Sequence, residues 1–131
     1  MEKYEKILRS MTFDFFGRGK HKVSVLDHFA NDNAVFLDIR SKEEHNAVAF
    51  NLKQYMPVLH IPIDELPYRI NEVPESKMIG IFCSSSVRSS MVYLYLRANG
   101  YENVGILEGG YDSIVKEFKP GNLFKYLLNK K

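Results

Sequence analysis

The chain has 131 residues, of which 45% are apolar and 26% charged, and its formal net charge is +2. This length and composition are typical of one globular domain, and so small a charge gives no indication of a nucleic-acid or membrane partner. The single cysteine cannot form an internal disulfide, and the N-terminal MEKYEKILRS lacks the apolar stretch of a signal peptide, so we expect a cytoplasmic location.

Helices and strands are predicted to alternate along the chain. Apolar periodicity and turn residues predict strands at 22–24, 34–39, 58–63, 77–82 and 103–110. Helices are expected at 4–11, from Ser24 or Asp27 through Phe29, and at 41–50, 88–100 and 111–118, with a weak helix over 64–73 interrupted by Pro67 and a last one over 121–128. Ser41 followed by Glu44 is typical of a capping box, and Gly100 is typical of a helix C-terminus.

The alternation favours a parallel sheet with helices on both faces. Ligands of such sheets bind beyond the carboxyl ends of the strands. Cys83 comes directly after the apolar strand that ends at Phe82, so the only thiol of the chain is expected at that edge.

The loop from Cys83 to Arg88, CSSSVR, joins this strand to a helix. Its small residues allow successive backbone N–H groups to form an anion-binding nest, and the N-terminus of the following helix adds positive potential. A thiolate held there is stabilised, and the thiolate is the nucleophilic form of cysteine. Arg88 adds a full positive charge near the rim; alternatively, it pairs with a carboxylate and takes no catalytic part.

Three further segments, in this order, carry a family resemblance. They are VFLDIRSKEEH (35–45), HIPIDELP (60–67) and IGIFCSSSVRSSMVYLYLRANGYENVGILEGGY (79–111). From Val23 to Phe118 the chain resembles the rhodanese-like domain of the single-domain sulfurtransferase type. The resemblance implies a three-layer α/β fold with a five-stranded, mostly parallel sheet. It also implies a domain core at 23–118, an N-terminal helical extension at 1–22 and a C-terminal helix or tail at 119–131.

The resemblance implies sulfur transfer through a cysteine persulfide. Cys83 takes the outer sulfur of a small donor such as thiosulfate or a persulfide, and then passes it to a thiol, cyanide or a protein acceptor. No cofactor is implied beyond the covalent persulfide. Arg88 closes the loop as the second catalytic residue.

Further site residues are implied by the same resemblance. The backbone amides expected to bind the substrate are those of Ser84, Ser85, Ser86, Val87 and Ser89. Structural residues expected near the site are Asp38 and Arg40, which brace neighbouring loops, and Glu108, Gly109 and Gly110, which lie beside the active loop.

The loop also departs from the usual family pattern. Ser84 and Ser86 replace a basic residue and a glycine; losing the basic residue weakens the case for a strongly anionic donor, and serine tolerates a positive φ poorly. Residues 48–59 contain an insertion, and Ile114 takes the place of a tryptophan. These departures favour the alternative of a non-catalytic interaction or regulatory module, whereas the intact Cys83 and Arg88 favour the enzyme, which is the preferred interpretation. Related phosphatases and arsenate reductases have one more residue between the cysteine and the arginine and form a third, more remote alternative.

The remaining polar and aromatic residues match no catalytic or metal-binding pattern. His21, His28, His45 and His60 match no metal-ligand spacing, so no metal site is expected. The basic group Arg18, Lys20 and Lys22 is interpreted as a solvated charge run or a dock for an anionic partner. Tyr93, Tyr95 and Leu96 are assigned to the core or an interface, and their exposed members are the candidates for a homodimer surface.

Overall fold

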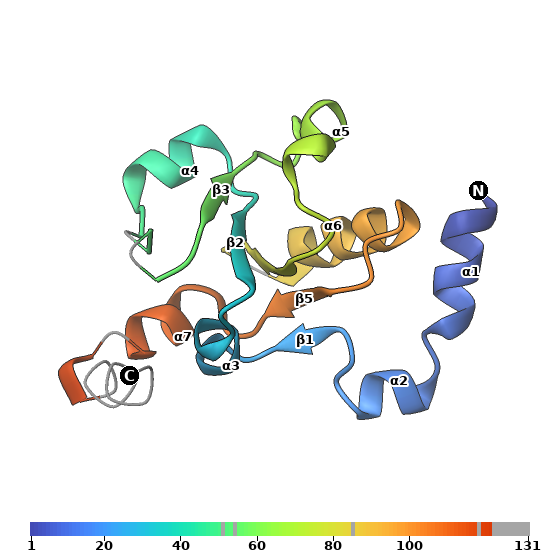
Figure 1. Ribbon diagram of the computed structural model, residues 1–131, viewed down its shortest axis with the longest axis horizontal. Coiled ribbons are helices and arrows are strands. Elements are labelled where there is room, and N and C mark those ends of the chain that lie inside the picture. The colour runs from blue at the N-terminus through green and yellow to red at the C-terminus, as the bar shows by residue number, and fades with distance from the viewer. Residues whose placement is uncertain (51, 54, 85, 118, 122–131) are drawn as a thin grey trace.

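Five strands form one central sheet in the computed structural model, which describes residues 1–50, 52–53, 55–84, 86–117 and 119–121 (Figure 1). The strands are β1 (Lys22–Val23), β2 (Ala34–Asp38), β3 (Val58–His60), β4 (Met78–Phe82) and β5 (Val104–Leu107), in the spatial order β1-β5-β4-β2-β3. Each of the four neighbouring pairs is parallel. The carboxyl ends of all five strands therefore face the same edge of the sheet.

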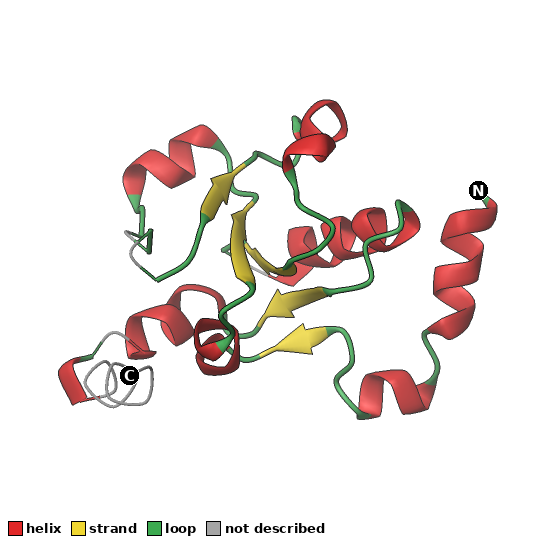
Figure 2. Cartoon of the chain, in the orientation of Figure 1, coloured by secondary structure: helices red, strands yellow, loops and turns green. Residues whose placement is uncertain are grey.

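Helices cover the two faces of this sheet, as Figure 2 shows in red. The helices of the described chain are α1 (Glu2–Ser10), α2 (Phe13–Gly17), α3 (Val25–Ala30), α4 (Lys42–Ala47), α5 (Leu66–Arg69), α6 (Ser86–Ala98) and α7 (Gly110–Glu117), with a 3₁₀ turn at Ile70–Glu72. Of these, α1 packs against α6. The predicted three-layer α/β fold is confirmed. None of the helices in the described part of the chain is long and apolar enough to cross a membrane.

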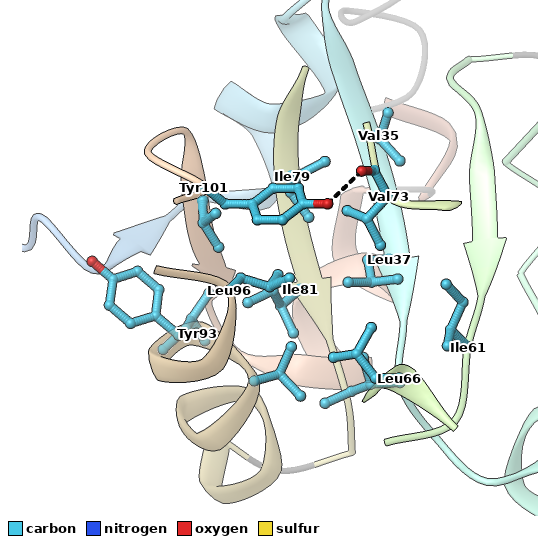
Figure 3. Packing of buried hydrophobic residues seen from close by; sticks show 14 of the residues in the cluster. Val35, Leu37, Ile61, Leu66, Val73, Ile79, Ile81, Tyr93, Leu96 and Tyr101 are labelled. Atoms are coloured by element: carbon cyan, nitrogen blue, oxygen red, sulfur yellow. Dashed lines mark hydrogen bonds between the residues drawn. The ribbon is translucent and has the colours of Figure 1, made fainter. Parts of the chain in front are cut away.

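One face of the sheet packs against α5 and α6 (Figure 3). The buried side chains of this layer include Val35, Leu37, Ile79, Ile81, Ile106, Val92, Tyr93 and Leu96. Tyr101 follows α6, and its hydroxyl donates a 2.7 Å hydrogen bond to the carbonyl oxygen of Val73, 28 residues away. Tyr93 and Leu96 are only 2% and 0% exposed, so these two of the candidate interface residues belong to the core, and Tyr95 is half-buried.

The opposite face packs against α3, α7 and the inserted segment. Leu52 and Met56 of the insertion are buried against the sheet, together with Phe36 and Phe82 of the strands. Ile114 of α7 is fully buried in the same layer, which explains why an apolar residue stands at that position. The insertion thus completes one of the two hydrophobic layers.

Helix ends follow the local signals in most places. Ser41 and Glu44 form both hydrogen bonds of the predicted capping box at the start of α4. Gly100 has a φ of 91° and ends α6 as expected, since a residue with a side chain rarely adopts this conformation. Pro67 does not interrupt a helix; it lies in the first turn of α5, where its missing N–H is not needed. The helix predicted over 121–128 lies outside the described residues, apart from residue 121.

We predict that Gly80→Ala destabilises the fold. A Cβ at Gly80 would lie 2.5 Å from Nε2 of the buried His28, which donates a 2.9 Å hydrogen bond to the carbonyl oxygen of Val35. Because the imidazole is buried and held by this hydrogen bond, overpacking is expected to lower the free energy of unfolding by about 1–3 kcal/mol. Urea denaturation measures the change. Gly17→Ala is the control, since no atom lies within 4 Å of its added Cβ; equal midpoints for the two variants would contradict the prediction.

Candidate active site

Cys83 lies where the sequence predicted, at the carboxyl end of β4. Its side chain is only 3% exposed and lines a cavity of about 370 Å³. The cavity lies between the active loop, the start of α6 and the ends of β1 and β5. The buried Ser89 of α6 donates a hydrogen bond from its hydroxyl to the Cys83 sulfur at 2.9 Å. Ser89 was predicted to contribute its backbone amide, whereas this side-chain contact was not predicted.

The serine-rich loop runs directly into α6. Ser84 and Ser86 line the cavity with Cys83, whereas Val87 is 62% exposed and does not line it. Ser85 lies outside the described residues. The sequence suggested that Ser86 restricts the loop because a glycine usually stands there. In the structure α6 begins at Ser86, two residues earlier than predicted, and no non-glycine residue in the described part of the chain has a positive φ. A side chain is therefore tolerated at this position.

Arg88 is paired with a carboxylate, as one of the two sequence-based interpretations expected. Its guanidinium donates to both carboxylate oxygens of Glu44, at 2.7 and 2.8 Å, and to the Ser84 hydroxyl at 2.6 Å. The hydrogen bonds from Arg88, followed by that from the Ser41 backbone, hold the pKa of Glu44 well below its usual range. Glu44 in turn raises the pKa of Arg88. This ion pair connects the active loop to α4.

Asp38 and Arg40 form a buried ion pair at the end of β2. The guanidinium donates to the two Asp38 oxygens at 2.9 and 2.8 Å and to the Tyr111 hydroxyl at 2.8 Å. It lies 5.0 Å from the centre of the Phe82 ring and 5.3 Å from that of Tyr111. Burial alone would raise the pKa of Asp38, but the hydrogen bonds from Arg40 and His45 outweigh it and lower the pKa.

Asp38, His45 and His60 together have the donor atoms of a metal site. Nδ1 of His45 is 2.9 Å from the Asp38 carboxylate, Nε2 of His60 is 2.8 Å from the Arg40 carbonyl oxygen, and the two imidazole rings are stacked at 3.9 Å. The Asp38 carboxylate already accepts hydrogen bonds from the Arg40 guanidinium, whose positive charge opposes a second cation there. Hydrogen bonding accounts for this group, and we do not assign a metal to it.

The turn that follows β5 lies against the active loop. Gly110 has a φ of 54°, and a Cβ at this position would lie 3.4 Å from the Ser84 carbonyl oxygen. A glycine here therefore lets the two backbones approach closely. Gly109 has a φ of 82°, and the exposed Glu108 lines the cavity.

Two further residues of the cavity were missed by sequence reasoning. Lys22 lines it from β1 and His21 from the residue before that strand, although Lys22 had been interpreted only as part of a charge run and His21 only as a scattered histidine. They reach the cavity because β1 pairs with β5, with Lys22 opposite Ile106. No local pattern in the sequence encodes this pairing.

Comparison with known proteins agrees with this geometry. The family model of the rhodanese-like domain matches residues 22–117. The chain belongs to the rhodanese-like family. A tRNA sulfurtransferase of Mannheimia succiniciproducens is 40% identical over 88 residues, which make up 67% of this chain and 17% of the relative. A tRNA sulfurtransferase of Aeromonas hydrophila is 36% identical over 77 residues, 59% of this chain and 16% of that protein. The chain thus spans about a sixth of the length of these curated relatives.

Solved structures show the same fold. A NAD-dependent persulfide reductase from A. fulgidus matches with a TM-score of 0.54 and 38% identity, over 69% of this chain and 15% of that one. A human single-domain sulfurtransferase matches with a TM-score of 0.56 and 20% identity, over 76% of this chain and 98% of that one, which indicates the fold alone. The comparisons thus establish the rhodanese-like family and its fold for this chain.

We predict that Glu44→Gln weakens the link between α4 and the active loop. Glutamine can keep the capping box but loses the charge that pairs with Arg88. At pH 7 the free energy of unfolding is expected to fall by about 1 kcal/mol, because the pair is partly exposed. The pKa of Glu44 is lower in the folded than in the unfolded state, so this contribution is present above about pH 4.3 and is lost as the pH falls further.

Urea denaturation of wild type and Glu44→Gln across this pH range tests the prediction. The matched control is Glu43→Gln, which removes the same charge from the exposed neighbour of Glu44. A loss of stability that is the same for both variants, or that persists unchanged at low pH, would contradict it.

We also predict that Ser89→Ala slows alkylation of Cys83. The Ser89 hydroxyl donates to the Cys83 sulfur, and a hydrogen bond to a charged group contributes about 1.5–3 kcal/mol. A more stable thiolate is also less nucleophilic, and this offsets about half of the rate increase that comes from the larger thiolate fraction. We therefore expect roughly three- to tenfold slower reaction with iodoacetamide at pH 7, followed by intact mass. Ser10→Ala, at an exposed serine of α1, is the control; a Ser89→Ala rate equal to that of this control would refute the role.

Proposed function

We propose that this protein is a sulfurtransferase in which Cys83 carries the sulfane sulfur as a persulfide. The observation that carries the proposal is the position of the thiol. Cys83 lines an open cavity at the carboxyl edge of a parallel sheet, and the Ser89 hydroxyl donates to its sulfur. A cysteine that served only as a small apolar residue would need neither the cavity nor the polar partner.

The reaction consists of two displacements on sulfur. The Cys83 thiolate attacks the outer sulfur of the donor; the new S–S bond forms as the donor's own bond to that sulfur breaks. With thiosulfate, sulfite leaves with the bonding electron pair. An acceptor thiolate then attacks the outer sulfur of the Cys83 persulfide, and the Cys83 thiolate leaves. No electrons are gained or lost overall, so the cycle needs no redox partner.

The residues around Cys83 have different parts in this proposal. Ser89 is proposed to stabilise the thiolate as attacking and leaving group, and the backbone amides of Ser84, Ser86, Val87 and Ser89 are proposed to bind the transferred sulfur. Arg88 holds the loop in shape through its contacts with Ser84 and Glu44. Asp38 and Arg40 position the neighbouring elements, through the contacts of Asp38 with His45 of α4 and of Arg40 with Tyr111 of α7.

The length of the loop also bears on the alternative reactions. Four residues separate Cys83 from Arg88, one fewer than in the related phosphatases and arsenate reductases, whose larger loop fits a tetrahedral oxyanion. This supports sulfur as the transferred group. A non-catalytic interaction module remains as the outcome that the experiment below would reveal.

Donor and acceptor are proposed by chemical class. Thiosulfate or a persulfide is the donor, and a thiol, cyanide or a protein is the acceptor. The relatives named tRNA sulfurtransferase match this chain over only 17% and 16% of their own length. We therefore do not infer a tRNA substrate for this chain.

We predict that Cys83→Ser abolishes sulfur loading and leaves the fold intact, because the substitution removes the nucleophile and keeps a side chain of similar size. Purified protein is incubated with thiosulfate or with a small persulfide, and its intact mass is recorded before and after a reducing thiol. Wild type is expected to gain one sulfur atom reversibly, and the variant none. If wild type gains no sulfur from either donor while Cys83 still reacts with iodoacetamide, the protein is an interaction module instead.

A further inference from the structure

Two opposite charges line the cavity that contains Cys83. Of the described residues that form its wall, Lys22 is the only lysine or arginine and Glu108 the only acid. Both side chains are exposed. The other described wall residues are His21, Cys83, Ser84, Ser86, Ser89, Ser90, Ile106, Leu107, Gly109 and Gly110.

Lys22 begins β1, and Glu108 directly follows the neighbouring strand β5. Lys22 of β1 is opposite Ile106 of β5, and the Glu108 backbone N–H donates to the Val23 carbonyl oxygen, which extends the ladder by one step. Side chains two residues apart on a strand lie on the same face. Ile106 and Glu108 therefore share the face on which Lys22 lies.

Neither charge is neutralised within the described part of the chain. Lys22 and Glu108 form no ion pair with each other or with another described residue, whereas Arg88 is fully engaged with Glu44. The neighbouring His21 adds no charge at neutral pH, because burial, followed by the charge of Lys22, lowers its pKa. The cavity therefore presents one cation and one anion to whatever enters it.

We infer that the sulfur acceptor is a small amino-acid thiol, whose carboxylate binds Lys22 and whose ammonium group binds Glu108. The inference rests on the proposed function of Cys83. A zwitterionic thiol such as cysteine matches both charges, whereas Glu108 repels a purely anionic compound. The cavity volume of about 370 Å³ lies at the small end of ligand pockets, which suits a compound of this size.

In the transfer step the acceptor thiolate attacks the outer sulfur of the Cys83 persulfide. A bond forms between the acceptor sulfur and that outer sulfur, and the bond from it to Sγ breaks. Cys83 leaves as a thiolate with the electron pair, and the acceptor becomes an amino-acid persulfide. Lys22 and Glu108 take no part in the bond changes; they orient the acceptor as specificity-determining residues.

Four thiols of similar size test the inference by charge alone: cysteine, 3-mercaptopropionate, cysteamine and 2-mercaptoethanol. They carry both charges, the carboxylate, the ammonium group and neither, respectively. Protein loaded with sulfur on Cys83 is mixed with each thiol, and loss of the persulfide is followed by intact mass. Rates are divided by the thiolate concentration of each acceptor, so that differences in thiol acidity do not enter.

The expected result is a pattern across two variants. Lys22→Gln slows cysteine and 3-mercaptopropionate by about two- to fivefold, the range for exposed charge pairs. It speeds cysteamine, because the repulsion of its ammonium group by Lys22 is removed, and it leaves 2-mercaptoethanol unchanged. Glu108→Gln slows cysteine and cysteamine by a similar factor and speeds 3-mercaptopropionate, because the repulsion is removed. These differences shrink at 0.5 M salt, which screens exposed charges.

Lys20→Gln is the matched control, since this exposed lysine is two residues from Lys22 and does not line the cavity. If either cavity variant changes all four rates equally, or none of them, the inference is overturned while the persulfide mechanism stands. If Cys83 cannot be loaded at all, the proposed function fails before any acceptor is added, and the inference fails with it.

Discussion

The buried guanidinium of Arg40 is the constraint on which the active-site edge of this protein depends. Its side chain is fully buried, and its charge is balanced by the carboxylate of Asp38, two residues earlier in the chain. Taking two charges out of water is costly, so such a pair is tolerated only when its hydrogen bonds are satisfied. Arg40 meets this condition through Asp38 and Tyr111, and the rings of Phe82 and Tyr111 surround it. One side chain thereby fixes the ends of β2 and β4 and the start of α7.

From this centre, a chain of contacts leads to Cys83. His45 of α4 bonds to Asp38, and Glu44, the residue before it, binds Arg88 of α6. Arg88 in turn donates to Ser84, next to Cys83. The active loop is thus held from α4 as well as from its own helix. Its shape follows from electrostatic contacts between residues 44 positions apart in the sequence as much as from local turn chemistry.

Local patterns in the sequence were enough to predict the strands, the capping box of Ser41 and the position of Cys83, because each depends on nearby residues or on a general rule of parallel sheets. The roles of Lys22 and Glu44 could not be predicted in this way. Lys22 reaches the cavity only because β1 pairs with β5, which follows some 80 residues later, and strand order is decided by tertiary packing. Glu44 fitted its local role in the capping box, so nothing in the sequence pointed to a second role with Arg88.

The shortness of the two edge strands, β1 and β3, limits how another protein can bind to this sheet. β1 has two residues and β3 has three, and β3 lies between Pro57 and Pro62, which have no N–H to donate. Short edge strands of this kind offer another chain few backbone groups for hydrogen bonding. Natural proteins use such strands to prevent two sheets from pairing edge to edge. Strand addition is therefore disfavoured on both sides. This leaves the helical faces and the rim of the cavity that contains Cys83 as the surfaces open to contact with another macromolecule.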